Sequence, residues 1–172
     1  LDDRFGCTVM LDMIEKETEY DAYYVFLVQE EVGLRGSAAA AYSVDPDYAI
    51  VLEATTASDV AGVSDENAVC LLSNGAVISF MDRSTVYDRR LFRRAFKVAE
   101  ENGVACQVKA AVAGGNDAGS IHKSRGGVYT ITVSLPCRYI HSATSVADER
   151  DMDSCRKLAE LLLFDFADAE AL

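Results

Sequence analysis

Hydrophobic residues along the chain follow two spacings, and their alternation predicts an α/β fold. Amphipathic or alanine-rich stretches with helical spacing are expected at 4–20, 36–42, 86–101 and 150–166. Runs rich in aromatic and β-branched residues predict strands at 23–30, 48–53, 69–72, 76–80, 104–112 and 128–135. Strands that alternate with helices are typical of a three-layer α/β/α sandwich with a mixed, largely parallel sheet.

Glycine and proline positions divide these elements. Ser73-Asn74-Gly75 has the composition of a hairpin turn between the strands predicted on either side of it. Gly103 is placed to end the helix that precedes it. Residues 114–127 form a long glycine-rich loop without the spacing of a dinucleotide or phosphate motif. No repeat or linker interrupts the pattern, so one domain is expected.

The strand predicted at 23–30 ends in two adjacent carboxylates, Glu30 and Glu31, just before Gly33. The carboxyl end of a central strand beside a glycine turn is where α/β folds place ligands. Adjacent carboxylates repel each other unless a cation or a proton intervenes. Alternation along a strand would send the two side chains to opposite faces, unless the chain bends back after Glu30. The alternative is a solvated strand end with no function.

Two further predicted strand ends carry similar chemistry. Glu53 closes the strand at 48–53, and His141 follows the strand at 128–135. Asp2 and Asp3 add a further acidic pair at the start of the chain. Carboxylates and imidazole together are the ligands of a dinuclear metal site. The alternatives are an exposed Glu53, a core histidine and an Asp pair that caps the following helix.

Composition narrows the class of protein. The 172 residues carry a net charge of −12, which disfavours binding to nucleic acid or to an anionic membrane. No apolar run approaches 18 residues. Five cysteines without a CxxC spacing indicate reduced thiols, and the chain is expected to be cytoplasmic. Cys137 lies four residues before His141, but no residue that would orient the imidazole for a cysteine nucleophile is evident.

Several segments together resemble the M42 metallo-aminopeptidases, the glutamyl or deblocking aminopeptidases of which some members were once labelled endoglucanase or cellulase M. The resemblance runs from Leu1 to about Leu163, and the segments QEEVGLRG and PCRYIHS are its most specific parts. The other segments that carry it are LDDRFGC, VLEATTASDVAG and GGNDAGSIHKSRGG. It implies a zinc-peptidase-like fold and hydrolysis of N-terminal residues from short peptides.

The resemblance also assigns roles around two divalent metal ions, zinc or cobalt. It implies that Asp2, with Asp3 as its rival, bridges the two ions, and that Glu31 and His141 complete the ligands of one of them. Glu53 would bind the other ion, at a position where many members of the family carry Asp.

The remaining roles fall on the turn after the first strand and on the glycine-rich loop. The resemblance implies that Glu30 is the general base. The loop would border the substrate pocket, with Asp117 and His122 as candidate residues. A loop histidine that bonds only to backbone is the alternative for His122.

Members of the family carry an earlier His-x-Asp motif and an inserted dimerisation domain. On that comparison residues 1–172 are expected to be the C-terminal part of a metallopeptidase catalytic domain, truncated at its N-terminus and inactive alone. The resemblance also implies a homo-oligomer. Two alternatives stay open, a catalytically incomplete fragment that acts only as a folded assembly module and a glycoside hydrolase that uses Glu30 and Glu31.

Overall fold

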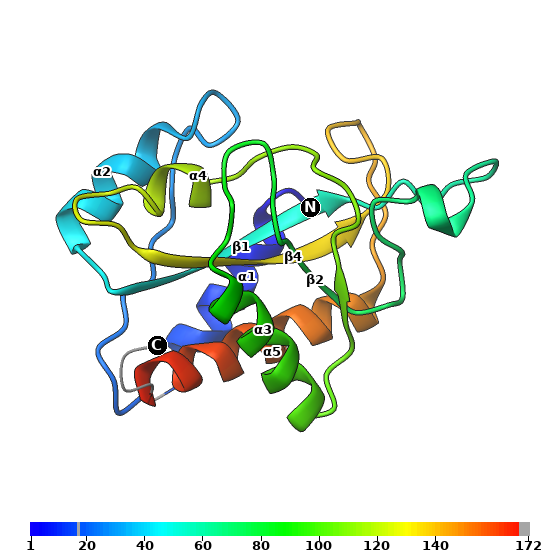
Figure 1. Cartoon of the computed structure of the whole chain (residues 1–172). Coiled ribbons are helices and arrows are strands. Elements are labelled where there is room, and N and C mark those ends of the chain that lie inside the picture. The colour runs from blue at the N-terminus through cyan, green and yellow to red at the C-terminus, as the bar shows by residue number, and fades with distance from the viewer. Residues whose placement is uncertain (17, 169–172) are drawn as a thin grey trace.

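A four-stranded mixed sheet lies between two layers of helices in the computed structural model, which describes residues 1–16 and 18–168 (Figure 1). The strands are β1 (Tyr48–Thr56), β2 (Ala76–Ile78), β3 (Cys106–Val108) and β4 (Tyr129–Cys137). The helices are α1 (Arg4–Ile14), α2 (Arg35–Val44), α3 (Arg89–Glu101), α4 (Ala118–Ile121) and α5 (Glu149–Asp168), with a 3-10 turn, η1, at Asp65–Asn67. None of these described helices is long and apolar enough to cross a membrane.

The strand order is β1-β4-β2-β3, and it confirms the mixed sheet. β1 pairs with β4 in parallel, β2 pairs with β3 in parallel, and β2 runs antiparallel to β4. The register of the long parallel pair sets Tyr48 opposite Tyr129 and Thr56 opposite Cys137. The carboxyl ends of β1 and β4 therefore meet at one edge of the sheet, close to the N-terminus of the chain (Figure 1).

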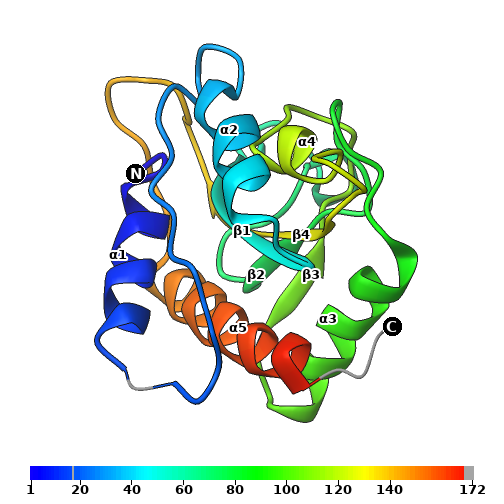
Figure 2. The same cartoon turned by 90° about the vertical axis from the view of Figure 1, so that its left-hand side faces the viewer.

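Two hydrophobic clusters cover the two faces of the sheet, which is why the helices form separate layers. α1, α3 and α5 pack on one face over the inward-facing residues of β4, such as Ile131 and Val133, both fully buried. α2 and α4 pack on the other face around Val51 of β1, with Ala41 and Ile121 as their contributions. Figure 2 shows the two layers on opposite sides of the strands.

The elements with the strongest periodicity form where the pattern predicts them. β1, β4, α3 and α5 differ from the expected bounds by three residues or fewer at each end. The Asp88 side chain accepts a hydrogen bond from the backbone N–H of Arg90 and caps α3, which therefore begins later than expected. Gly103, with a φ of +61°, follows the end of α3. The glycine-rich loop contains the short helix α4, and the helix expected at 4–20 ends at Ile14.

The strand predicted at 23–30 does not form, and this prediction was wrong. Residues 21–27 are assigned to no strand, and the structure gives them no backbone ladder with any described residue. Tyr23 and Val28 are 72% and 67% exposed. A strand needs a partner for its backbone groups, which a local pattern of apolar residues cannot provide.

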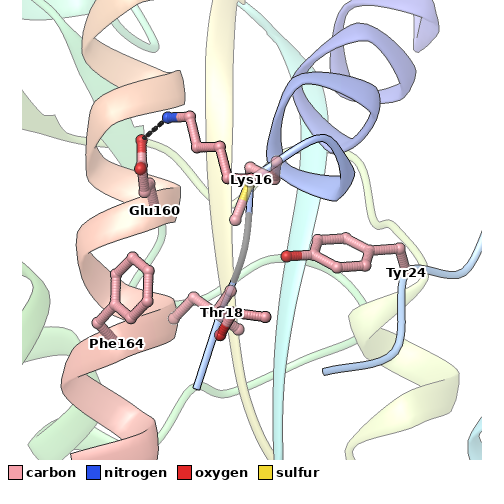
Figure 3. Close-up of a pocket in the computed structure, with 7 residues that line it drawn as sticks. Lys16, Thr18, Tyr24, Glu160 and Phe164 are labelled. Atoms are coloured by element: carbon pink, nitrogen blue, oxygen red, sulfur yellow. Dashed lines mark hydrogen bonds and ion pairs between the residues drawn. The ribbon is translucent and has the colours of Figure 1, made fainter. Parts of the chain in front are cut away.

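Tyr24 of the same segment packs against the layer of α1 and α5, and Leu27 packs against the cluster on the opposite face. Tyr24 lies with Met13, Thr18 and Leu163 around a depression of about 10 Å³ between α1 and α5 (Figure 3). Beside it, the Lys16 ammonium lies 2.6 Å from a carboxylate oxygen of Glu160. This volume holds about one water molecule, so the depression is a packing defect and no substrate pocket.

The hairpin predicted around Ser73-Asn74-Gly75 is also absent. Residues 69–72 form no strand, and β2 pairs with β3 and β4. The backbone N–H groups of Ser73 and Gly75 both donate to the buried carboxylate of Asp151 on α5, at 2.7 and 2.6 Å. This carboxylate holds the turn against the helix, so the turn residues connect a loop to β2 rather than two paired strands.

Candidate active site

Three segments that are far apart in the sequence meet at the carboxyl ends of β1 and β4. They are the first residues of the chain, the turn at 28–36 that leads from residues 21–27 into α2, and the loop at 138–146 after β4. Each brings one ligand-type side chain, namely Asp2, Glu31 and His141.

The three side chains converge closely enough to share one cation. His141 Nε2 lies 3.1 Å from Asp2 Oδ2 and 3.2 Å from Glu31 Oε1. One ligand atom from each of the three residues lies within 4.8 Å of the others. The Asp2 side chain is 17% exposed, whereas those of Glu31 and His141 are about 60% exposed, so the cluster opens to solvent.

This donor set fits a divalent metal such as zinc. Two ligands bound at about 2.0–2.1 Å in tetrahedral geometry stand roughly 3.3 Å apart, which is close to both contacts of the imidazole. Two carboxylates and one imidazole also leave a fourth position open, as catalytic zinc sites require. Asp2, Glu31 and His141 are therefore the residues that would hold such an ion.

Glu53 reaches the same place from the end of β1. Its carboxyl group hydrogen-bonds to Asp2, and its Oε1 accepts from the backbone N–H of Ala54 at 2.9 Å. Burial raises the pKa of Glu53 well above its usual range, and the hydrogen bond to Asp2 and the charge of Asp3 raise it further. Asp2 therefore contacts ligand-type side chains on both sides, His141 on one and Glu53 on the other.

A tight turn brings Glu30 and Glu31 to one site. The carbonyl of Glu30 accepts hydrogen bonds from the backbone N–H groups of Gly33 and Leu34, and the carbonyl of Val28 accepts from that of Gly36. Gln29 and Leu34 adopt positive φ angles of 59° and 55°, which reverse the chain without a continuing strand. The chain thus bends back after Glu30, as placing both carboxylates at one site requires.

Glu30 lies among negative charges. Burial raises its pKa to about 7, and the charges of Asp117, Glu31 and Asp2 add to the shift. A carboxyl group that titrates near neutral pH can both accept and return a proton under physiological conditions. Glu30 therefore has the chemistry of a general acid–base group beside the cluster.

Asp3 has a structural contact that its neighbour Asp2 lacks. Its side chain accepts a hydrogen bond from the backbone N–H of Gly6 at 3.0 Å and caps α1. Burial raises the pKa of Asp3 to about 7. Cys137, considered above as a nucleophile, is fully buried, and burial raises the pKa of its thiol, which opposes formation of a thiolate.

The two loop candidates separate in space. Asp117, at the start of α4, is 7% exposed and hydrogen-bonds to Ser37 of α2, and its charge acts on Glu30. Its Oδ1 is buried without a hydrogen-bond partner in the described part of the chain. His122 instead contacts the carbonyl of Ala118 through Nδ1 at 2.7 Å.

His122 also lines an open groove of about 450 Å³ together with residues 85–88 and 126–130. That groove begins where β4 begins, and His141 follows the other end of the strand. A nine-residue strand is roughly 26 Å long, so the groove is remote from the metal-ligand cluster.

One contact near the site was not anticipated from the sequence. Arg138 and Asp59 form a two-pronged ion pair that joins the segments following β4 and β1. Its only sequence signal is the position of Arg138, three residues before His141 in the PCRYIHS segment.

Comparison with known proteins adds an independent line of evidence. The family model described as M42 glutamyl aminopeptidase matches residues 1–158. A putative aminopeptidase from Acetivibrio thermocellus is 37% identical over 160 residues, which are 92% of this chain and 48% of that protein.

Solved structures agree with the sequence comparison. The aminopeptidase APDkam598 from the archaeon Desulfurococcus kamchatkensis superposes with a TM-score of 0.90 at 34% identity, over 98% of this chain and 48% of the other. A Pyrococcus horikoshii TET1 peptidase, described as able to assemble into a tetrahedron or a large octahedral shell, gives a TM-score of 0.76 at 30% identity. That match covers 94% of this chain and 47% of the peptidase. The chain therefore spans about half the length of the relatives it matches.

Proposed function

This chain belongs to the M42 glutamyl aminopeptidase family, and on that premise we propose that it contributes to a metal-dependent site for removing N-terminal residues from short peptides. One observation carries the proposal. Asp2, Glu31 and His141, from three distant segments, place one ligand atom each within 4.8 Å of one another beside Glu30. Such convergence is what a catalytic metal site needs, and two carboxylates with an imidazole suit a divalent metal such as zinc.

The protein groups divide the work between holding a metal and moving a proton. A divalent metal, when bound, supplies Lewis-acid polarisation of the scissile carbonyl and acidifies water. The charges of Asp2 and Glu31 contribute to the raised pKa of Glu30, and this pKa of about 7 suits proton transfer. We assign it the removal of a proton from the attacking water and the delivery of that proton to the leaving amine.

A second metal position would be formed around Glu53. Among residues 1–16 and 18–168, its candidate ligands are Asp2 and Glu53, against three for the first position. Asp2 would then be a candidate ligand at both positions, and two ions would together stabilise the attacking and leaving groups of the hydrolysis. With only two ligands at the second position, we expect residues 1–172 alone to turn over no peptide.

Assembly into a homo-oligomer is part of the same proposal. Support comes from the TET1 peptidase of Pyrococcus horikoshii, whose description names tetrahedral and octahedral assemblies. Size-exclusion chromatography with light scattering on the full-length protein would measure the mass in solution. A monodisperse monomer would contradict the proposal of an oligomer.

The test of the function is a metal-dependent peptidase assay. The full-length protein, stripped with EDTA and reloaded with zinc or cobalt, should release N-terminal residues from short peptides only after reloading. The matched variant is Glu31→Gln, which keeps the size of a ligand side chain and removes its charge. Peptidase activity that survives EDTA and the Glu31→Gln change would contradict the proposal.

A further inference from the structure

His141 lies in an exposed loop that provides it with little support. Its side chain is 63% exposed, and it contacts the carboxylates of Asp2 and Glu31. The residue has a φ of +59°, a conformation that non-glycine residues adopt at a cost. A metal-binding histidine usually donates its second ring N–H to a fixed acceptor. In the described part of the chain, Nδ1 of His141 has no such partner.

The loop is closed on itself by its own hydrogen bonds. Arg138 and Val146 exchange backbone hydrogen bonds of 2.9 and 3.0 Å at its base. Within the loop, the Ser142 hydroxyl contacts the carbonyls of Tyr139 and Thr144 at 2.6 and 2.8 Å. These bonds fix the shape of the loop, but they do not attach its apex to the rest of the site.

The Arg138 side chain attaches the base of the loop to the segment that follows β1. Its Nε donates to Asp59 Oδ1 at 2.7 Å and its Nη2 donates to Asp59 Oδ2 at 2.8 Å. Asp59 is itself held, because its Oδ2 accepts from the backbone N–H of Leu72 at 2.9 Å. The Asp59 side chain is only 8% exposed, and Arg138 holds the pKa of that carboxyl below its usual range. The pair therefore stays charged at neutral pH.

The Arg138–Asp59 pair lies just beyond the end of the sheet, on the side where the metal-ligand candidates are. Thr56 and Cys137 are the last opposed residues of the parallel strands β1 and β4. Asp59 follows the first by three residues, and Arg138 follows the second directly. The pair thus joins the segments that follow β1 and β4 just beyond the sheet. One of these strands carries Glu53, and the loop after the other carries His141.

We propose that the Arg138–Asp59 ion pair is a positioning device that fixes the 138–146 loop so that the His141 imidazole points at Asp2 and Glu31. The inference rests on the proposed metal site and deepens it. A planar guanidinium that binds a carboxylate through two parallel bonds defines direction as well as distance. The Arg138–Asp59 pair compensates for the missing partner on the second ring nitrogen of His141, because it holds the backbone of the loop in place of the ring.

A second ion pair provides a matched control. Arg94 on α3 also binds a carboxylate, that of Asp165 on α5, through Nε and Nη2. Its side chain is 38% exposed, against 35% for Arg138. The Arg94 pair joins α3 to α5 and has no hydrogen bond to the loop at 138–146 among the described residues. Loss of either pair removes similar contacts, but only loss of the Arg138 pair should affect metal binding.

The experiment measures zinc affinity in the full-length protein by competition with a chromophoric chelator. Arg138→Ala should weaken zinc binding by about 10–100-fold, the usual effect of losing an outer support of a ligand. Arg94→Ala should stay within about twofold of wild type. Arg138→Lys should lie between them, since it keeps the charge and loses the fork. Asp59→Asn provides a second route to the same loss if Arg138→Ala does not fold.

Cobalt absorption supplies a readout that general stability would not move. In the visible spectrum of the cobalt-loaded protein, Arg138→Ala should shift toward the spectrum of His141→Ala, and Arg94→Ala should not. The inference is overturned if zinc binding weakens equally in Arg138→Ala and Arg94→Ala, or if Arg138→Ala binds zinc as wild type does. In either case, loss of zinc binding in His141→Ala would leave the proposed function standing. Unchanged affinity in His141→Ala overturns both.

Discussion

The carboxyl group of Glu53 hydrogen-bonds to Asp2 at the carboxyl end of β1. Burial is the main cause of the raised pKa of Glu53, and it also raises the pKa values of Asp3 and Glu30 to about 7. Burial thus disfavours the ionised form of three acids that would be ionised in the unfolded chain at neutral pH. Ionising these acids in the metal-free site costs free energy through burial and mutual repulsion, and a bound cation would offset that cost.

The pH dependence of stability follows from these shifts. A raised folded pKa means that the folded state binds more protons than the unfolded state, so stability falls as pH rises. In EDTA, the free energy of unfolding should therefore decrease from pH 5 to pH 8, the window between the unfolded acids and the folded pKa values of about 7. Urea titrations at several pH values would measure it.

Two controls sharpen that measurement. Glu53→Gln removes one raised carboxyl group and should flatten the slope between pH 5 and pH 8. Saturating zinc should restore stability most at pH 8. There the carboxylates are ionised, and protons compete least with zinc for them. A metal-free protein whose stability rises through this window would show that the site acids are not protonated in the fold.

Glu30 and Glu31 should separate in their effects on activity and metal content. Glu30→Gln should lower turnover by about 10²–10⁴-fold and keep the metal, because the amide cannot accept the proton. Glu31→Gln should lose metal together with activity, since Glu31 lies against His141. Metal analysis beside the peptidase assay measures both. A metal-free Glu30→Gln protein would make Glu30 a ligand and would overturn this division.

The two metal positions should fill unequally. Asp2, Glu31 and His141 offer three ligands to one position, whereas Asp2 and Glu53 are the candidates for the other within the described residues. Calorimetric titration of residues 1–172 should therefore show one tighter zinc site. His141→Ala should abolish that site, while Glu53→Ala should spare it. Two equal and tight sites in residues 1–172 would contradict the assignment.

The sequence patterns predicted best those elements whose signals lie within the element itself. β4 is buried along nearly its whole length, and α3 repeats an apolar stripe with a cap and a terminal glycine, so each can be recognised without its neighbours. The segment at 21–28 has strand-like residues, but pairing depends on a partner elsewhere in space. Its exposed Tyr23 and Val28 show that composition alone did not determine the pairing.

The candidate site divides in the same way. The identities of Glu30, Glu31 and His141 come from motifs, but their convergence depends on positive φ angles at residues such as Gln29 and His141 itself. No propensity predicts those angles. The Arg138–Asp59 pair joins residues 79 positions apart, so no local pattern could indicate it. Long-range polar pairs are therefore the part of this site that only the fold reveals.

Asp151 should be important for stability although it lies outside the candidate site. It is fully buried, and its two oxygens accept the backbone N–H groups of Ser73 and Gly75. Asp151→Ala would leave both donors unpaired, at a cost of roughly 2–4 kcal/mol. Asp153→Ala, two residues along the same helix and largely exposed, should stay within about 0.5 kcal/mol. Equal midpoints in chemical denaturation would contradict the role assigned to Asp151.

Gly36 should be required for the turn that carries Glu30 and Glu31. A Cβ at this position would lie 2.6 Å from the carbonyl oxygen of Val28 and 3.0 Å from its backbone nitrogen. Both neighbours are backbone atoms, which cannot rotate away as a side chain would. Gly36→Ala should therefore displace the turn at 28–36 and weaken zinc binding, even though alanine favours the helix α2 that begins there.

Gly126→Ala is the matched control for this change. A Cβ on Gly126 would meet no atom within 4 Å, and the residue lies beside the groove far from the ligand cluster. It should bind zinc as wild type does, whereas Gly36→Ala should lose affinity and shift the cobalt spectrum, because Glu31 moves relative to His141. Wild-type zinc affinity in a folded Gly36→Ala protein would show that the turn tolerates the displacement. Ligand geometry would then not depend on the close approach of Gly36 to Val28.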